Sequence, residues 1–262
     1  MPLRVGFAIP AVRTVNSELA ALDSVLLNSR VSSSKERSSQ KGPPHNPEVR
    51  DLVEGKRRWS SSSDQESAKL GFRSWHERGY LPHRDQPGLI QLVTFHLEDS
   101  FPAALRSEWE ALLKIENNLQ RRTQLEAYLD KGGGECSLRH PEVAALVENA
   151  LRFFHGQRYD LRAWVVMPNH VHVLFKVDNT PMSQVVRSWK RHTARQANRL
   201  LGRQGPFWQE DYWDTWMRDS QHEARAVHYI ESNPVKPGLA RTSTAWRWSS
   251  ARFRDQYGRL CL

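Results

Sequence analysis

Two histidines, His170 and His172, flank a single valine inside the apolar run "RAWVVMPNHVHVLFKV". On a β-strand, residues two apart project from the same face of the sheet. Two imidazoles at this spacing can hold a divalent metal ion and leave coordination positions open for water, another side chain or a phosphate oxygen. An open site suggests catalysis rather than a structural metal. The same spacing also occurs on a surface strand without any metal, so the pair alone leaves both interpretations open.

A second candidate pair lies near the end of the chain, where Tyr229 is followed four residues later by Asn233. On a helix this spacing puts both side chains on one face, about one turn apart. Pro234 ends the helix and disfavours helical geometry at the residue before it, so Asn233 should lie at the boundary with its amide able to turn toward a metal. The alternative is an ordinary helix-ending turn, with Tyr229 as a core aromatic residue.

The elements that must position these residues are predicted from hydrophobic periodicity. We expect strands at residues 90–97, 160–167, 171–177 and 213–217, and helices at 102–129, 141–154, 182–201 and 221–232. Pro168 and Asn169 should form a tight turn between the second and third strands. This order predicts an α+β fold in which helices flank a small antiparallel sheet.

The chain divides near residue 70. Residues 28–69 are dominated by Ser, Lys, Arg, Glu, Pro and Gly, with almost no periodic apolar positions, which is typical of disorder. Residues 15–27 could form a short helix, but nothing beside them offers a partner surface. We therefore predict a disordered or low-complexity extension at 1–70, a folded domain at 71–255 and a C-terminal tail at 256–262.

The overall composition favours a polyanionic partner. Lys and Arg total 38 against 29 Asp and Glu, which gives a formal net charge of +9 and makes nucleic acid the first candidate. Cys136 and Cys261 are too few for a disulfide framework or a thiolate zinc site, which favours a reducing, cytoplasmic setting. No run reaches transmembrane length, and the N-terminus is a poor secretory signal, so we expect no membrane partner.

The helix expected at 182–201 carries a candidate DNA-binding surface. Its cations recur about once per turn along one face: Arg187, Lys190, Arg191 and Arg195. Such a stripe can track a phosphate backbone, although a solvated helix face is the common alternative. Exposed members of a tryptophan set further along the chain could stack on unpaired bases: Trp208, Trp213 and Trp216.

Three motifs in order resemble the REP-associated tyrosine transposases, which are relatives of the single-tyrosine HUH transposases. They are "RAWVVMPNHVHVLF", "FWQEDYWDTWMRD" and "HYIESNPVKPGLA", and the segments "GYLPH", "PGLIQLVTF" and "WRWSSAR" are also similar to that family. The similarity runs from about Gly71 to Phe253. It implies the HUH fold, a small antiparallel sheet flanked by helices, in agreement with the periodicity.

The resemblance also implies a role for each candidate residue. His170 and His172 match the two histidines that hold a divalent metal, Mg²⁺ or Mn²⁺, and Asn233 matches the polar residue that completes the metal set. Tyr229 matches the tyrosine nucleophile. One departure is Thr215, because relatives often carry a histidine in the "YWDTWMRD" segment.

The activity that follows from this resemblance is metal-dependent cleavage and transfer of single-stranded DNA at hairpins of palindromic repeats. The covalent intermediate would join Tyr229 to a 5′ phosphate, and the protein would act as a monomer or a homodimer. A hairpin-binding protein with little cleavage is the first alternative, which the change at Thr215 would permit. A metal-dependent hydrolase of small molecules is the second, but it would need further ligand motifs and no tyrosine.

Overall fold

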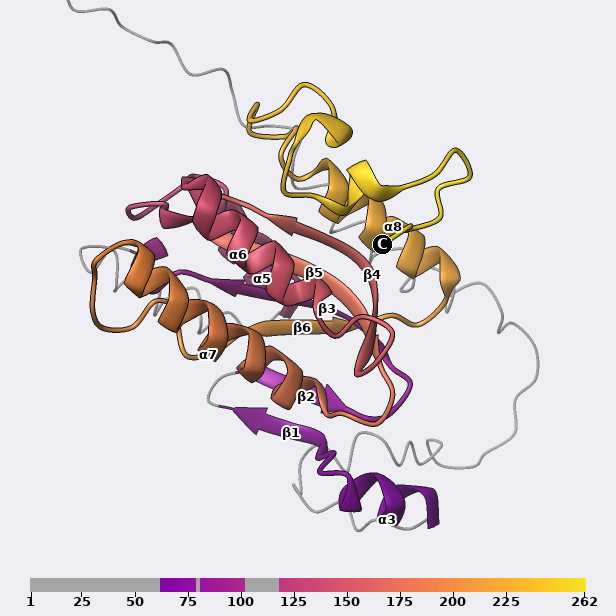
Figure 1. Cartoon of the computed structure of the whole chain (residues 1–262). Coiled ribbons are helices and arrows are strands. Elements are labelled where there is room, and N and C mark those ends of the chain that lie inside the picture. The colour runs from indigo at the N-terminus through magenta and orange to yellow at the C-terminus, as the bar shows by residue number, and fades with distance from the viewer. Residues whose placement is uncertain (1–61, 79–80, 102–117) are drawn as a thin grey trace, which may run out of the picture.

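A computed structural model describes residues 62–78, 81–101 and 118–262 of the chain (Figure 1). Its centre is a four-stranded antiparallel sheet in the order β4-β5-β3-β6. The strands are β3 (Ile90–His96), β4 (Tyr159–Val166), β5 (His170–Val177) and β6 (Trp213–Trp216). The helices that flank the sheet are α5 (Asn118–Leu129), α6 (Pro141–Arg152), α7 (Met182–Leu200) and α8 (Ser220–Ser232). The predicted α+β class is confirmed.

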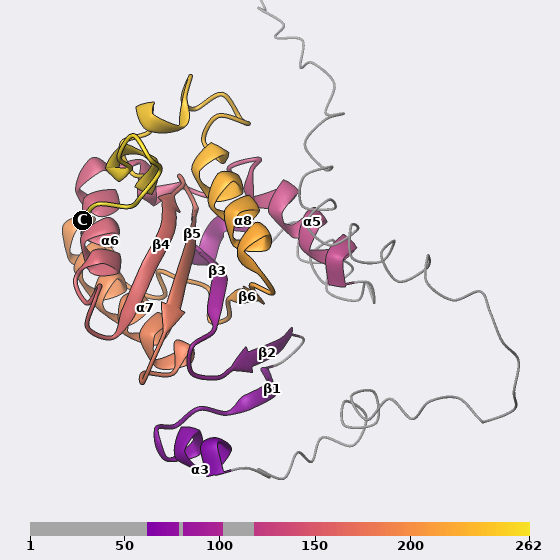
Figure 2. The ribbon, with the colours of Figure 1, turned by 90° about the vertical axis from the view of Figure 1, so that its right-hand side faces the viewer.

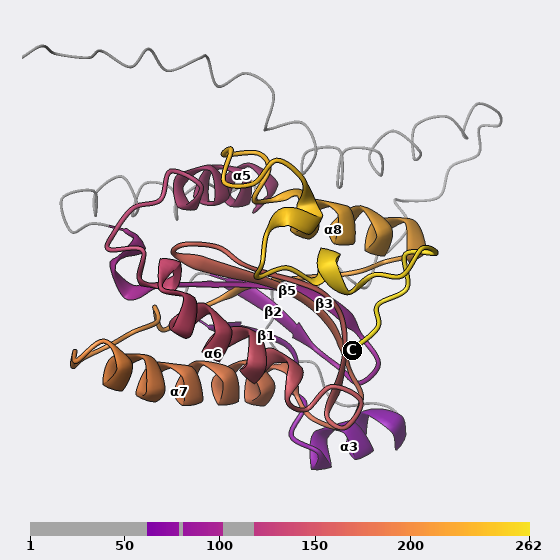
Figure 3. The same ribbon diagram turned by 45° about the horizontal axis from the view of Figure 1, so that its top comes forward.

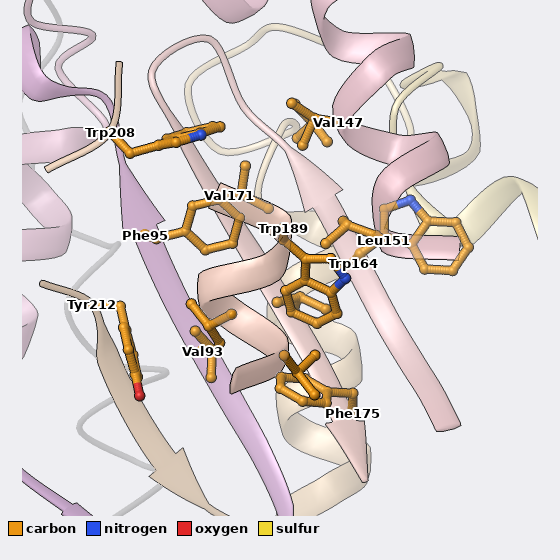
Figure 4. Packing of buried hydrophobic residues seen from close by; sticks show 14 of the residues in the cluster. Val93, Phe95, Val147, Leu151, Trp164, Val171, Phe175, Trp189, Trp208 and Tyr212 are labelled. Atoms are coloured by element: carbon orange, nitrogen blue, oxygen red, sulfur yellow. The ribbon is translucent and has the colours of Figure 1, made fainter. Parts of the chain in front are cut away.

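The helices cover the sheet in two separate layers. Figures 2 and 3 show α6 and α7 on one face and α5 and α8 on the other. The larger core lies under α6 and α7, where alternate residues of β3 and β5 meet the two helices. Figure 4 shows Phe95, Val171 and Phe175 packed in this core beside Trp189 of α7. A sheet with both faces covered explains why β5 reads as an almost continuous apolar run.

The strand register decides which face carries the histidines. In the β3–β5 pairing, Thr94 lies opposite His172 and His96 lies opposite His170. Because side chains alternate along a strand, these four residues share the face of Leu92 and Leu174. Both leucines belong to the smaller core that contains Tyr229 and Ile230 of α8, among others. The histidines and Tyr229 therefore meet on the α5–α8 side.

A β-hairpin that periodicity did not predict precedes the sheet. Its strands are β1 (Ser74–Arg78) and β2 (Leu81–Asp85), and β2 includes the end of the "GYLPH" segment. His83 Nδ1 pairs with Asp214 Oδ1 of β6, and Asp85 Oδ1 accepts a hydrogen bond of 3.1 Å from the backbone N–H of Met182, where α7 begins. The hairpin is therefore fixed by buried polar contacts, which leave no alternating apolar pattern in the sequence.

The described residues bear on three of the predicted segments. The extension predicted as disordered at 1–70 ends in the helix α3 (Ser62–Lys69), and the rest of it lies outside the described residues. The helix predicted at 102–129 is described only from Asn118 to Leu129, while the helix suggested at 15–27 lies outside the described residues. The C-terminal tail folds back, because the Cys261 N–H donates to the carbonyl of Phe253 at 2.8 Å.

The "WRWSSAR" segment closes the outer edge of β4. The Val166 N–H donates to the carbonyl of Trp248 at 2.8 Å, and the Trp164 N–H donates to Ser250 Oγ at 3.0 Å. Buried Glu148 of α6 accepts from Trp164 Nε1 at 3.0 Å and from Arg252 Nη2 at 2.8 Å. This motif thus has a structural role. In the described ranges, none of the helices has the length and apolar composition of a membrane span.

Candidate active site

Asn169, in the turn between β4 and β5, determines the protonation of His170. Its Nδ2 donates to the carbonyls of Leu129 at 3.1 Å and Gly133 at 3.3 Å, so its Oδ1 faces His170 Nδ1 at 2.8 Å. An amide oxygen only accepts, so His170 carries its proton on Nδ1 and keeps the lone pair on Nε2. That Nε2 atom is buried and makes no hydrogen bond within the described part of the chain.

His172 is held in a similar way from the neighbouring strand. Its Nδ1 lies 2.7 Å from the hydroxyl of buried Thr94, so Nε2 is the nitrogen left for a ligand if the ring donates from Nδ1. The two rings of His170 and His172 lie 4.8 Å apart between centroids, and each residue is only 1% exposed. The spacing predicted from the sequence therefore produces a buried imidazole pair on one face.

Burial keeps this pair neutral. Loss of solvation lowers the pKa of His172 to about 3, with a further lowering by the charge of Lys236. The pKa of His170 lies well below its ordinary value, mainly through burial and then through the neighbouring His172 and His96. A neutral imidazole is the form that binds a metal ion, so the pair is ready for a metal at neutral pH.

Tyr229 reaches the pair from α8. This helix begins at the N-cap Asp219, whose side chain accepts from the His222 N–H at 2.7 Å, and it buries Ala226 and Ile230 against the sheet. The Tyr229 ring lies 5.4 Å from the His172 ring between centroids, and its hydroxyl donates to Glu126 Oε2 of α5 at 2.8 Å. The predicted nucleophile and the predicted metal pair are therefore in contact.

Lys236 approaches the same tyrosine from the segment after α8. Its Nζ lies 4.3 Å from the centre of the Tyr229 ring. A cation at this distance favours negative charge on the phenol. Burial raises the pKa of Asp130 to about 6, and the charge of Lys236 partly offsets this rise.

Asn233 ends α8 as predicted, but Pro234 does not pull it out of helical geometry. The residue is the C-cap with φ −52° and ψ −42°, because the tertiary packing outweighs the local preference before proline. Its side chain is 1% exposed, and neither amide atom makes a hydrogen bond within the described residues. An unsatisfied buried amide is costly unless a ligand completes it.

These donors fit a divalent metal. Two neutral imidazoles and an amide oxygen suit Mg²⁺ or Mn²⁺ less well than carboxylates do, yet they leave positions open for phosphate oxygens. Among the described residues, no group of three or more His, Cys, Asp and Glu side chains could hold a metal. Asp130 Oδ1 stands 4.0 Å from His170 Nε2 and is the acid beside the pair. The amide oxygen of Asn233 stays the expected third ligand, as the family resemblance implies.

The α7 arginines are exposed but lie away from this site. Arg187, Arg191 and Arg195 point to solvent from a helix that covers the opposite face of the sheet. Lys190 differs from them, because its Nζ donates to the carbonyls of Gln209 at 2.5 Å and Glu210 at 2.6 Å. The expected stripe therefore consists of three arginines, and Lys190 holds the loop before β6.

Only one of the three tryptophans considered for base stacking is available. Trp208 and Trp213 are buried in the two faces of the fold, so they are not among the exposed members to which the stacking prediction applies. Trp216 is partly exposed, and its ring centre lies 4.3 Å from the Arg84 guanidinium and 5.7 Å from that of Arg218. Thr215 lies opposite Leu92 in β6, which puts it on the histidine face.

Sequence reasoning missed four side chains that contact the site: Thr94, Glu126, Asn169 and Lys236. Thr94 gave a signal, as a polar residue on the face of an apolar strand. Asn169 was interpreted only as a turn residue. Glu126 gave no signal, because its contact with Tyr229 depends on how α5 docks.

The segment from residue 142 to residue 233 matches the family model described as "Transposase IS200 like". This segment contains both histidines, Tyr229 and Asn233. The match covers about a third of the chain, and over this segment it confirms the resemblance drawn from the motifs.

Two curated proteins are also similar to the chain. The REP-associated tyrosine transposase of Escherichia coli K12 is 28% identical over 92 residues, which are 35% of this chain and 54% of that protein. The putative REP-associated tyrosine transposase of Haemophilus influenzae is 25% identical over 103 residues, 35% of this chain and 58% of that protein. The chain thus spans about half the length of these relatives.

A solved structure is also similar to the chain. It is the REP-associated tyrosine transposase bound to a REP hairpin, with 22% sequence identity and a TM-score of 0.39. The match covers 69% of this chain and 85% of that one.

Proposed function

We propose that the protein is a metal-dependent single-strand DNA endonuclease and strand transferase that acts on hairpins of palindromic repeat DNA. One observation carries this proposal: the His170 and His172 rings, neutral and adjacent, share a buried face of the sheet with the Tyr229 hydroxyl. A small-molecule hydrolase would have no use for that tyrosine. The names of the curated relatives support a transposase.

The residues would divide the reaction between them. His170, His172 and Asn233 would hold Mg²⁺ or Mn²⁺, which supplies positive charge to a non-bridging oxygen of the scissile phosphate. The Tyr229 oxygen would attack phosphorus, forming a bond to the 5′ phosphate, while the bond to the 3′ oxygen breaks. That 3′ hydroxyl can later attack the phosphotyrosine and reseal or transfer the strand. The covalent intermediate conserves the energy of the cleaved bond, so no nucleotide cofactor is needed.

A separate surface would hold the DNA outside the site. We propose that Arg187, Arg191 and Arg195 contact phosphates of the hairpin, which the net charge of +9 favours. The α7 helix covers the face of the sheet opposite the histidines. A hairpin that contacts these arginines must therefore reach around the edge of the sheet from the strand that is cleaved at Tyr229. The protein would act on DNA in the cytoplasm, as a monomer or a homodimer.

The test compares the wild-type protein with Tyr229→Phe on end-labelled hairpins from palindromic repeats, with Mn²⁺ or Mg²⁺ present. We expect a covalent adduct at the 5′ side of the break, which disappears with the variant and with a chelator. Tight binding without cleavage would support the hairpin-binding alternative, which the change at Thr215 permits. Neither binding nor cleavage on any hairpin would overturn both.

A further inference from the structure

A carboxylate of α5 contacts the Tyr229 hydroxyl. The phenol donates to Glu126 Oε2 at 2.8 Å, and both side chains are 4% exposed. A buried carboxylate at this distance is in direct reach of the phenolic proton. The helix holds it there through Leu125 and Leu129, which pack against Trp213 of β6.

A tyrosine nucleophile needs a proton acceptor, because a free phenol titrates near pH ~10. The other groups beside Tyr229 are less suited to this role. His172 meets the ring of Tyr229 edge-on, and its two nitrogens serve Thr94 and the proposed metal. Lys236 is a cation above the ring and stabilises the phenolate instead.

We propose that Glu126 is the general base that takes the phenolic proton of Tyr229 during strand cleavage. The inference rests on the proposed function above. As the bond between the Tyr229 oxygen and phosphorus forms, the phenolic proton passes to Glu126 Oε2, and the bond from phosphorus to the 3′ oxygen breaks. The departing 3′ oxygen takes a proton from water. In the reverse step, the attacking 3′ hydroxyl gives its proton to water, and Glu126 returns its proton to the phenol oxygen.

The test measures the rate of adduct formation by the full chain with Mn²⁺ for wild type, Glu126→Gln and Glu142→Gln. General bases typically contribute 10²–10⁴-fold, so Glu126→Gln should slow the adduct by at least about 100-fold. Glu142, an exposed acid of α6, should be replaceable without effect. Unfolding temperature and hairpin affinity, measured alongside, should stay near wild type, because glutamine preserves the shape of the side chain.

A second substrate distinguishes a base that accepts the phenolic proton from an acid that protonates the departing 3′ oxygen. With sulfur in place of the bridging 3′ oxygen, the leaving thiolate needs no proton, yet the nucleophile still must lose one. We therefore expect the Glu126→Gln defect to persist on this substrate. A Glu126→Gln defect that vanishes on the sulfur substrate would overturn this inference but not the proposed function. The same holds if Glu126→Gln forms the adduct on the ordinary hairpin at a rate within twofold of wild type. It also holds if the variant forms the adduct faster, because Glu126 would then restrain Tyr229. No adduct from the wild-type protein would overturn the proposed function as well.

Discussion

The side-chain amide of Asn169 links His170 to α5. Its oxygen accepts the Nδ1 proton of His170 at 2.8 Å, while its nitrogen donates to the carbonyl of Leu129 at 3.1 Å. The lone pair of His170 is thereby directed away from the turn, on Nε2. Partners of this kind fix the tautomer and orientation of metal-binding histidines.

Replacing Asn169 by alanine should weaken the binding of Mn²⁺ by about 10- to 100-fold, the usual effect of losing such a partner. Asn169→Asp keeps an acceptor for His170. It should therefore bind Mn²⁺ about ten times more tightly than Asn169→Ala does. Isothermal titration under conditions where each variant is folded measures both affinities. Equal affinity of wild type and Asn169→Ala would show that the turn does not prepare the histidine for metal.

The three α7 arginines predict a specific dependence of hairpin binding on salt. Each phosphate contact adds nearly one to the slope of log K against log salt, so replacing Arg187, Arg191 and Arg195 by alanine should reduce the slope by about 2 to 3. Fluorescence anisotropy over a range of salt concentrations measures it. Arg241→Ala, at an exposed position after α8, is the control. An unchanged slope would identify the stripe as a solvated helix face.

The buried histidines predict that the metal-free protein loses stability in acid. Burial lowers the pKa of His96 and of His172 to about 3, whereas an unfolded histidine titrates near 6.5. Below pH 6.5 the unfolded chain therefore binds more protons, and stability falls until the pH reaches about 3. Each histidine contributes up to about 1.4 kcal/mol per pH unit.

Urea unfolding at pH 7, 6 and 5 measures this slope. His96→Gln should reduce the slope, while exposed His140→Gln should leave it unchanged. An equal slope in both variants would mean that His96 is not held neutral in the folded protein.

Glu148 predicts a large stability effect far from the chemistry. Alanine at this position leaves Trp164 Nε1 buried without its acceptor and removes the partner of Arg252, so we expect a loss of about 3 kcal/mol in the free energy of unfolding. Exposed Glu142 on the same helix should change it by less than about 0.5 kcal/mol. Urea denaturation gives both values, and a loss below 1 kcal/mol at Glu148 would contradict this account.

Local patterns predicted the elements but not their arrangement. Alternation located β3, an apolar run after the Pro168-Asn169 turn located β5, and α6 and α7 were located to within two residues at each end. The same periodicity indicated that Arg187 and Arg191 face solvent. It could not show which face of the sheet α7 covers, because that depends on the path of the connection between β5 and α7. The position of the arginine stripe on the face opposite the histidines therefore came only from the structure.

The candidate site shows the same limit. His170, His172 and Tyr229 could be selected because their spacing follows the periods of a strand and a helix. Glu126 comes from a third element, and only the docking of α5 brings it to the phenol. The β1–β2 hairpin escaped prediction for a related reason, since His83 is fixed by one carboxylate of β6 rather than by an apolar face.

The C-terminal segment that borders β4 also bears on aggregation. An open strand edge offers its backbone N–H groups to any other extended chain. In this protein the N–H groups of Trp164 and Val166 are already bonded to Ser250 and Trp248. Proteolysis between α8 and Trp246 would uncover these groups on a strand whose second half is apolar on both faces. Residues 246–262 therefore block the addition of another strand at the edge of β4, in the sheet that carries the two histidines.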